Sequence, residues 1–144
     1  MIRAVLDTNV LASGLISAGT APGHLLSLWE ANAFELTVSH HIMVELERTL
    51  AKPYFESRFH AGERERAIER LRAYARSTAI TVVVEGVATH PEDDLVLATA
   101  ISAGATVLVT GDRGLREVGA YRGVTILTPR EFSTLLEQVG LNQS

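Results

Sequence analysis

The sequence predicts an α/β fold built on a parallel β-sheet. Five short apolar runs alternate with segments whose apolar residues recur at helical spacing, which is the pattern of a parallel sheet with helical crossovers. Two of the runs, Thr-Val-Val-Val at 81–84 and Thr-Val-Leu-Val at 106–109, are almost continuously apolar, as strands covered on both faces should be. The length of 144 residues suits a single domain, 1–144, with a full hydrophobic core.

The strands are expected where β-branched and aliphatic residues cluster between polar or turn-forming residues. These runs are 2–6, 35–38, 80–85, 106–110 and 124–127.

Most of the expected helices start after a residue that favours helix N-termini. Ser39 is the expected N-cap of a helix over 40–51, and Thr128, Pro129 and Glu131 form a capping box for 130–138. The region 39–79 holds two helices before the next strand. The full set of expected helices is 21–31, 40–51, 61–76, 92–103 and 130–138.

Aspartates mark a candidate site at one edge of the sheet. The chain has only four, Asp7, Asp93, Asp94 and Asp112, against thirteen glutamates. Asp7 and Asp112 follow predicted strands, and the carboxyl ends of parallel strands share one edge, where ligands bind. A helix entering the sheet at this edge would add Asp94. Each aspartate alone is explained as a cap or turn residue, so the prediction rests on their convergence.

Converging carboxylates need a compensating group. Two carboxylates about 4 Å apart repel by roughly 4 kcal/mol at an effective dielectric constant near 20. Protonation, an arginine or a divalent cation would relieve that repulsion. Hard oxygen ligands in a chain without cysteine favour Mg²⁺ or Mn²⁺.

Charge is distributed unevenly along the chain. The net charge is −4, but residues 52–76 carry seven cations and four anions, so this segment is +3 and the remainder −7. A basic segment on an acidic body fits a protein that holds phosphates with one face and cations with another. The same segment is also explained as a solvated helix with Glu–Arg pairs.

Composition excludes several classes of protein. No apolar run approaches the roughly 18–20 residues of a membrane span, and the N-terminus lacks the features of a secretory signal. The absence of cysteine excludes disulfides and thiolate metal sites. A soluble cytoplasmic protein is therefore expected.

The chain contains three informative motifs: D-T-N-V-L from Asp7, E-D-D-L-V-L-A-T-A from Glu92, and V-T-G-D ending at Asp112. Together they resemble the PIN-domain nuclease family, most closely the VapC-like toxins of toxin–antitoxin pairs. The resemblance implies a three-layer α/β/α sandwich around a parallel sheet of four to five strands. It also implies an acidic pocket that binds Mg²⁺ or Mn²⁺, cleavage of phosphodiester bonds, usually of RNA, a small antitoxin protein as partner, and a homodimer.

Carried over by position, the resemblance implies four catalytic, metal-binding carboxylates: Asp7, Glu45, Asp94 and Asp112. The polar residues expected around them are Asn9, Ser13, Asp93 and Thr110. Ser13 and Thr110 would orient the ligands by hydrogen bonds, although Ser13 is equally explained as a helix-surface hydroxyl. Asp93 is either a hydrogen-bond acceptor behind the ligands or only a helix-terminal charge.

Two of these assignments choose between close neighbours. Helical phase does not separate Glu45 from Glu47, and the motif E-L-x-x-x-L favours Glu45, which leaves Glu47 as a solvated surface charge. Spacing to Leu97 favours Asp94 over the adjacent Asp93, which lies about 100° away on the helix.

The expected chemistry is hydrolysis by a metal-activated water, with a second metal, if present, stabilising the leaving oxygen. The five histidines form no convincing pair for metal-free cleavage, and His40 and His41 are expected only to cap a helix start. The product should therefore carry a 5′-phosphate.

The basic segment is the expected RNA grip, through Arg58, Arg64 and Arg72. Aromatic residues at 54, 55 and 59 precede these arginines, and aromatic rings beside arginines can stack unpaired bases. The same rings are also explained as a hydrophobic anchor or a surface for the protein partner, so segment 52–76 is expected to serve both RNA and protein.

Two other folds with acids at strand ends are excluded. A response-regulator receiver needs a lysine at the rim, and the only lysine, Lys52, falls in the helical insertion. A haloacid-dehalogenase-type phosphatase needs a second acid where this chain has Asn9. A catalytically weak PIN-like RNA-binding or scaffold module remains the alternative function.

Overall fold

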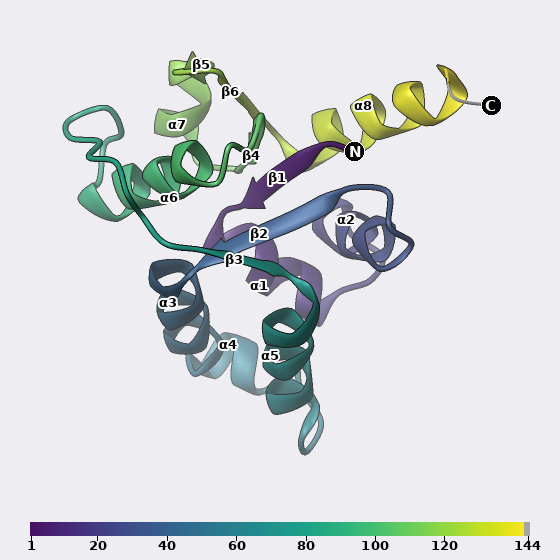
Figure 1. Ribbon diagram of the computed structural model, residues 1–144. Coiled ribbons are helices and arrows are strands. Elements are labelled where there is room, and N and C mark those ends of the chain that lie inside the picture. Colours follow the sequence, from purple (N-terminus) through teal and green to yellow (C-terminus); the bar gives the residue numbers. More distant parts are fainter. Residues whose placement is uncertain (143–144) are drawn as a thin grey trace.

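A computed structural model describes residues 1–142 and shows a six-stranded sheet between two layers of helices (Figure 1). The strands lie in the order β3-β2-β1-β4-β6-β5 and all neighbours pair in parallel except β5 and β6. Their bounds are β1 Arg3–Leu6, β2 Glu35–Ser39, β3 Arg76–Thr78, β4 Val107–Val109, β5 Ala120–Tyr121 and β6 Val124–Leu127. The predicted α/β class is confirmed, and the sheet is parallel as predicted except for the β5–β6 pair.

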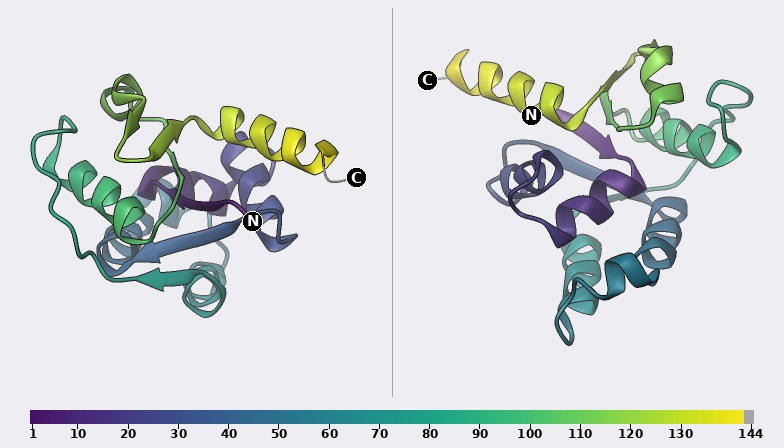
Figure 2. Two further views of the ribbon diagram at one scale, coloured as in Figure 1. Left: turned by 45° about the horizontal axis from the view of Figure 1, so that its top comes forward. Right: turned by 180° about the vertical axis from the view of Figure 1, so that it is seen from behind.

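The helices cover both faces of the sheet, as three layers require (Figures 1 and 2). One face carries α6 (Pro91–Ser102) and α7 (Arg113–Val118). The other carries α1 (Thr8–Ile16), α2 (Ala21–Glu30) and α8 (Pro129–Asn142), extended by α3 (His40–Leu50), α4 (Pro53–Glu56) and α5 (Glu63–Tyr74). None of the helices in the described part of the chain is both long and apolar enough to cross a membrane.

Burial of the central strands holds the layers together. Ala4, Val5 and Leu6 of β1 are fully buried, and β4 is buried along its length. At the far side of the core, Phe34 meets Phe132 of α8 edge to face, with ring centroids 5.0 Å apart. Each such large apolar side chain contributes about 1.5–3 kcal/mol through burial.

Local capping explains where several helices begin. The Ser39 hydroxyl accepts a hydrogen bond from the Ile42 N–H at 3.3 Å and so caps α3. At α8 the Thr128 hydroxyl accepts from the Glu131 N–H at 3.1 Å, while the Glu131 carboxylate accepts from the Thr128 N–H at 2.9 Å. The predicted N-cap and capping box are confirmed.

The predicted strand at 80–85 is wrong. The third strand lies earlier, at β3, where Thr37, Val38 and Ser39 of β2 pair with residues 76–78. Because β2 ends at Ser39, residues 80–85 have no strand to pair with, and they run irregularly over the surface, with Val83 73% exposed and Val84 buried. The preceding helix, expected over 61–76, therefore stops at Tyr74.

The insertion and the second edge of the sheet also differ from expectation. Between β2 and β3 there are three helices rather than two, because α4 forms a single turn after Pro53. The sheet has six strands rather than four or five, because a tight hairpin through Arg122 (φ 45°) and Gly123 (φ 82°) adds the antiparallel β5. Residues 143 and 144 of the expected domain lie outside the described residues.

Candidate active site

Asp7 lies at the carboxyl end of the central strand. Its N–H continues the sheet by donating to the Val109 carbonyl at 2.9 Å, and the residue is only 6% exposed. Burial raises the pKa of Asp7, and the negative charge of Asp112 adds to this effect. The Thr110 hydroxyl and the N–H groups of Asn9 and Thr8 oppose it but do not cancel it.

Thr110 connects the ends of β1 and β4. Its buried hydroxyl donates to Asp7 Oδ2 at 2.7 Å and accepts from the Asp112 N–H at 3.0 Å. Both capacities of this hydroxyl are therefore used to hold the loop after β4 against the Asp7 carboxylate.

Asp112 lies on the same rim and also has a local structural role. Its Oδ2 accepts from the Leu115 N–H at 2.9 Å and caps α7, while its charge raises the pKa of Asp7 and of Asp93. Asp112 thus shares the electrostatic environment of Asp7 while one of its oxygens is engaged by the backbone.

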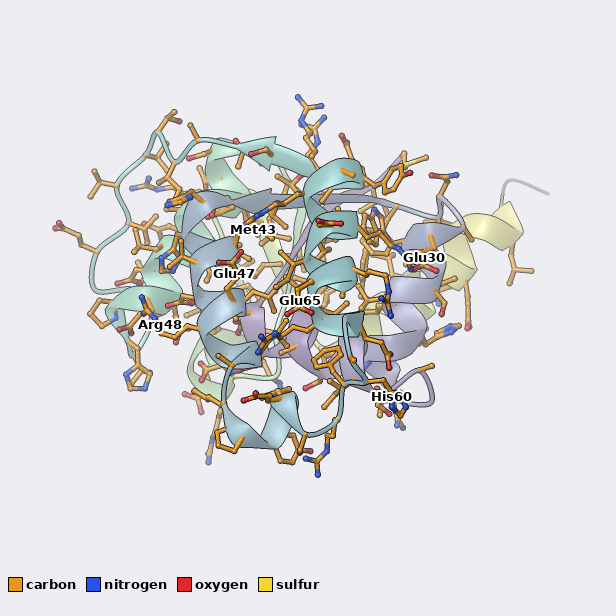
Figure 3. The ribbon with its side chains drawn as sticks, turned by 90° about the horizontal axis from the view of Figure 1, so that it is seen from below. Glu30, Met43, Glu47, Arg48, His60 and Glu65 are labelled. Carbon is orange, nitrogen blue, oxygen red and sulfur yellow. The ribbon has the colours of Figure 1, made fainter. Side chains whose placement is uncertain are left out.

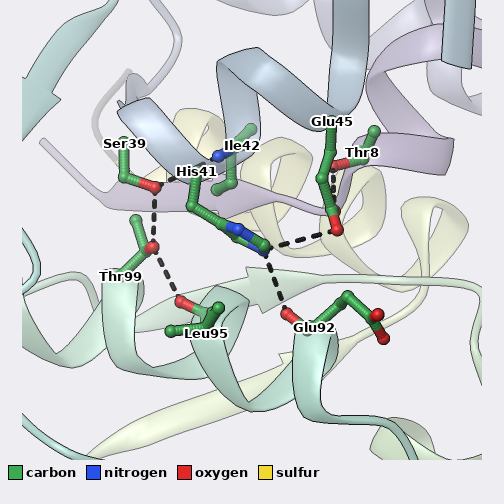
Figure 4. A network of polar contacts seen from close by, with 8 residues as sticks. All are labelled: Thr8, Ser39, His41, Ile42, Glu45, Glu92, Leu95 and Thr99. Carbon is green, nitrogen blue, oxygen red and sulfur yellow. Dashed lines mark hydrogen bonds and ion pairs between the residues drawn. The ribbon is translucent and has the colours of Figure 1, made fainter. Parts of the chain in front are cut away.

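Glu45 reaches the rim from α3 and is held by two neighbours (Figure 4). Glu45 Oε2 accepts from the Thr8 hydroxyl at 3.3 Å, and Oε1 lies 3.6 Å from His41 Nε2. The same nitrogen of His41 lies 3.2 Å from the Glu92 carbonyl oxygen, so His41 connects α3 to the start of α6. Sequence reasoning missed this role of His41, although its spacing of four residues from Glu45 was a usable signal.

Glu47 takes a different direction from Glu45. It forms an ion pair with Arg72 of α5, on the side of α3 that faces α5 in Figure 3. The choice between the two glutamates, which helical phase left open, thus corresponds in space to two sides of α3.

Asp93 and Asp94 lie in different surroundings. Asp94, the expected metal ligand, contacts the loop before α6, and Asp93 lies near the other acids. Both Asp94 oxygens accept backbone N–H groups of the preceding loop, from Gly86 at 3.0 Å, Val87 at 3.2 Å and Ala88 at 2.7 Å. Asp94 therefore anchors the loop to the first turn of α6, and its carboxylate has no hydrogen bond to another predicted ligand. Asp94 is not among the residues that line the hollow described below, whereas Asp93 is.

Asp93 is the acidic residue of α6 that shares the electrostatic environment of Asp7. Burial, followed by the charges of Asp7 and Asp112 and then of Glu45, raises the pKa of Asp93 to about 6, with His90 acting in the opposite direction. Asp93 and Asp94 are adjacent in the first turn of α6, so their side chains leave the helix in different directions. Because Asp94 is turned toward the preceding loop, Asp93 is turned toward the other acids.

A hollow of about 270 Å³ opens between the end of β1, α3 and the start of α6. It is lined by Asp7, Thr8, Asn9, Glu45, Arg48, Thr49, Lys52, Glu92 and Asp93. Asn9 is thus on its wall. Ser13 is absent from it and makes no side-chain hydrogen bond within residues 1–142.

The arginines expected to grip RNA all have partners within the chain. The Arg58 guanidinium lies 3.6 Å from the centroid of the Tyr54 ring and donates to the Tyr54 carbonyl. Arg64 pairs with Glu65 at 3.2 Å. Arg72 pairs with Glu47. Two of the three arginines are thus in ion pairs with glutamates, which fits the other explanation of the segment's charge, a solvated helix with Glu–Arg pairs.

The donor set fits a hard divalent cation by its chemistry. Asp7, Glu45 and Asp93 offer oxygen ligands of the kind that Mg²⁺ and Mn²⁺ prefer. Burial and neighbouring negative charge raise the pKa of Asp7 and of Asp93, and a bound cation would favour the ionised form of both. Among the described side chains, however, no three His, Asp or Glu groups already stand in a metal-binding arrangement.

The fold and the hollow define a class: an α/β domain with acidic residues gathered at the carboxyl edge of its sheet. Residues 3–114 match the family model of the PIN domain. The chain therefore belongs to the PIN domain family, whose members are nucleases.

Solved structures share the fold at low identity. The chain is similar to the crystal structure of VapBC2 from Rickettsia felis bound to a DNA fragment from their promoter (TM-score 0.60, 14% identity, covering 87% of this chain and 97% of that one). It is also similar to PAE2754 from Pyrobaculum aerophilum (TM-score 0.60, 20% identity, covering 97% of this chain and 90% of that one). No curated protein matches the sequence.

Proposed function

We propose that this protein is a metal-dependent endoribonuclease that cleaves phosphodiester bonds of RNA. One observation carries the proposal: carboxylates from three separate parts of the chain, Asp7, Glu45 and Asp93, line one small hollow. The negative charge of Asp7 helps to raise the pKa of Asp93, and the pKa of Asp7 is raised as well. Membership of a nuclease family supports the same assignment.

Asp7, Glu45 and Asp93 would hold the cation, with Asp112 adding negative charge beside them. A bound Mg²⁺ or Mn²⁺ supplies a more acidic water for attack on phosphorus and offsets the charge of the phosphate. Asp94, assigned to the metal from the sequence, instead fixes the loop before α6, so we place it in a positioning role.

The chain's own residues keep the acids oriented. Thr110 holds one oxygen of Asp7, while Thr8 and His41 hold the two oxygens of Glu45. The reaction needs no pair of histidines, so the 2′-hydroxyl of the RNA need not attack and the downstream product carries a 5′-phosphate.

We also propose that the protein is the toxin of a toxin–antitoxin pair, a cytoplasmic homodimer that binds a small antitoxin protein. The similarity to the VapBC2 structure supports this proposal. A catalytically weak RNA-binding or scaffold module is the second candidate, because backbone N–H groups already engage Asp94 and one oxygen of Asp112.

Cleavage of a labelled single-stranded RNA tests the proposal. Wild-type protein with Mn²⁺ or Mg²⁺ should cut it and leave 5′-phosphate ends, detected by digestion with a 5′-phosphate-dependent exonuclease. EDTA, Asp7→Asn and Glu45→Gln should each abolish the cutting. Glu47→Gln is the matched control, since Glu47 lies on the other side of α3 and its loss should leave the rate unchanged. Binding of RNA without any cutting would favour the scaffold module.

A further inference from the structure

Two cations stand on the wall of the acidic hollow. Arg48 lies in the last turn of α3 and Lys52 follows that helix by two residues, and both line the hollow together with Glu45. Arg48 follows Glu45 by three residues in α3, so the two share one face of that helix. Figure 3 shows Arg48 on the side of α3 that is turned away from α5.

Backbone hydrogen bonds fix the position of Lys52. Lys52 donates its N–H to the Thr49 carbonyl at 3.1 Å, and its own carbonyl accepts from the N–H groups of Phe55 at 3.0 Å and Glu56 at 2.9 Å. The side chain of Lys52 therefore starts from a fixed point between α3 and α4, and the residue is exposed.

Neither side chain is paired. Within the described residues, Arg48 and Lys52 make no hydrogen bond and no ion pair through their side chains, even though four carboxylates line the same hollow. The three arginines expected to grip RNA, in contrast, are all engaged by Tyr54 or by glutamates. Arg48 and Lys52 are therefore unpaired cations at the hollow itself, where an incoming anion would meet the carboxylates.

We infer that Arg48 and Lys52 bind the phosphates of the RNA strand that flank the scissile phosphate. This inference rests on the proposed ribonuclease function. An RNA strand must approach carboxylates that repel it, and two unpaired cations on the wall offset that repulsion. Arginine can hold a phosphate through two parallel N–H bonds, while lysine contributes a compact point charge.

RNA binding without cleavage tests the inference. Asp7→Asn protein in EDTA is titrated into a fluorescent single-stranded RNA, and anisotropy gives the affinity over a range of salt concentrations. In that background, Arg48→Gln with Lys52→Gln should weaken binding about tenfold at 0.1 M salt. The magnitude of the slope of log affinity against log salt should fall by about 1.4, or about 0.7 for each single substitution. The variant makes fewer phosphate contacts, so its binding releases fewer counterions from the RNA.

Arg122→Gln provides the matched loss of charge. Arg122 lies in the turn before β6, at the opposite edge of the sheet from Asp7, where its guanidinium stands 5.1 Å from the centroid of the Tyr121 ring. Its substitution should leave both the affinity and the salt slope unchanged.

Three outcomes would overturn the inference. An unchanged affinity and salt slope in the double variant would do so. So would a lower melting temperature with an unchanged slope, because Arg48 would then act only on the C-terminal dipole of α3. A change in Mn²⁺ affinity without a change in RNA binding would show that the cations act only on the carboxylates. A wild-type protein that neither binds nor cuts RNA would overturn the proposed function as well, whereas active wild-type protein with any of these three results would overturn the inference alone.

Discussion

Replacing Asp93 by Asn should stabilise the metal-free protein at neutral pH. Asp93 has a pKa of about 6 in the folded chain, because burial and the charges of Asp7, Asp112 and Glu45 all disfavour its ionised form. The ionised carboxylate therefore destabilises the folded protein. The neutral amide of Asn has nearly the same shape and lacks this unfavourable charge.

The size of this effect follows from the difference between about 6 and the ordinary value of 3.8. The full difference corresponds to about 3 kcal/mol. Asp93 is partly exposed and water screens its charge, so we expect about 1 kcal/mol, or a rise in melting temperature of roughly 2–4 °C. Because the folded-state pKa is raised, the destabilisation is absent below pH 3.8, grows between pH 3.8 and 6, and is complete above pH 6.

Thermal unfolding followed by circular dichroism in EDTA measures the difference between wild type and Asp93→Asn. The gap should be present at pH 7.5 and close at pH 4. Added Mn²⁺ should reverse the order at pH 7.5, because the cation stabilises the wild type more than the variant. A variant that is less stable than wild type at pH 7.5 in EDTA would refute the placement of Asp93 among the acids.

Three further substitutions and one control test other parts of the structure, each by thermal or urea unfolding. Asp94→Asn should destabilise the protein by about 2 kcal/mol, whereas Asp93→Asn stabilises it, because the amide nitrogen cannot accept and leaves at least one of the three loop N–H groups without its acceptor. Thr110→Val should cost about 1–3 kcal/mol and raise the pKa of Asp7 further, which an NMR titration of that carboxyl would detect. Gly23→Ala should cost about 2 kcal/mol, since an added Cβ would lie 2.0 Å from the Ser17 carbonyl oxygen. Gly19→Ala, with nothing within 4 Å, should change stability by less than about 0.5 kcal/mol.

The centre of the sheet was predictable because burial on both faces leaves a clear trace in sequence. Apart from Arg3, the run that became β1 is apolar, β4 is apolar along its length, and these apolar residues are buried. The helix caps at Ser39 and Thr128 were predictable because they depend only on neighbours within three residues.

The edges of the sheet were not predictable in the same way. β3 consists of Arg-Ser-Thr and is defined by pairing with a strand far away in sequence, so it carries no apolar pattern. The apolar run at 80–85 follows Thr78, which pairs with Ser39 at the end of β2. Residues 80–85 therefore have no further β2 residues to pair with. β5 has two residues, which is too short for any periodic signal.

At the site, the sequence indicated the rim but not the direction of each side chain. Parallel strands bring Asp7 and the loop carrying Asp112 to one edge, so their proximity followed from topology. The exchange between Asp93 and Asp94 depended on three N–H groups in an irregular loop that no periodicity describes. Likewise, the net charge of segment 52–76 could not show which of its cations are already paired, as Arg72 is with Glu47.

Binding of Mn²⁺, followed by electron paramagnetic resonance of the free ion, tests the central claim most directly. If acids from distant parts of the chain share one hollow whose charge a cation offsets, wild-type protein and Glu47→Gln should both remove Mn²⁺ from solution. The protein carrying both Asp7→Asn and Asp93→Asn should remove none. Equal uptake by that double variant, or no uptake by the wild type, would contradict the account.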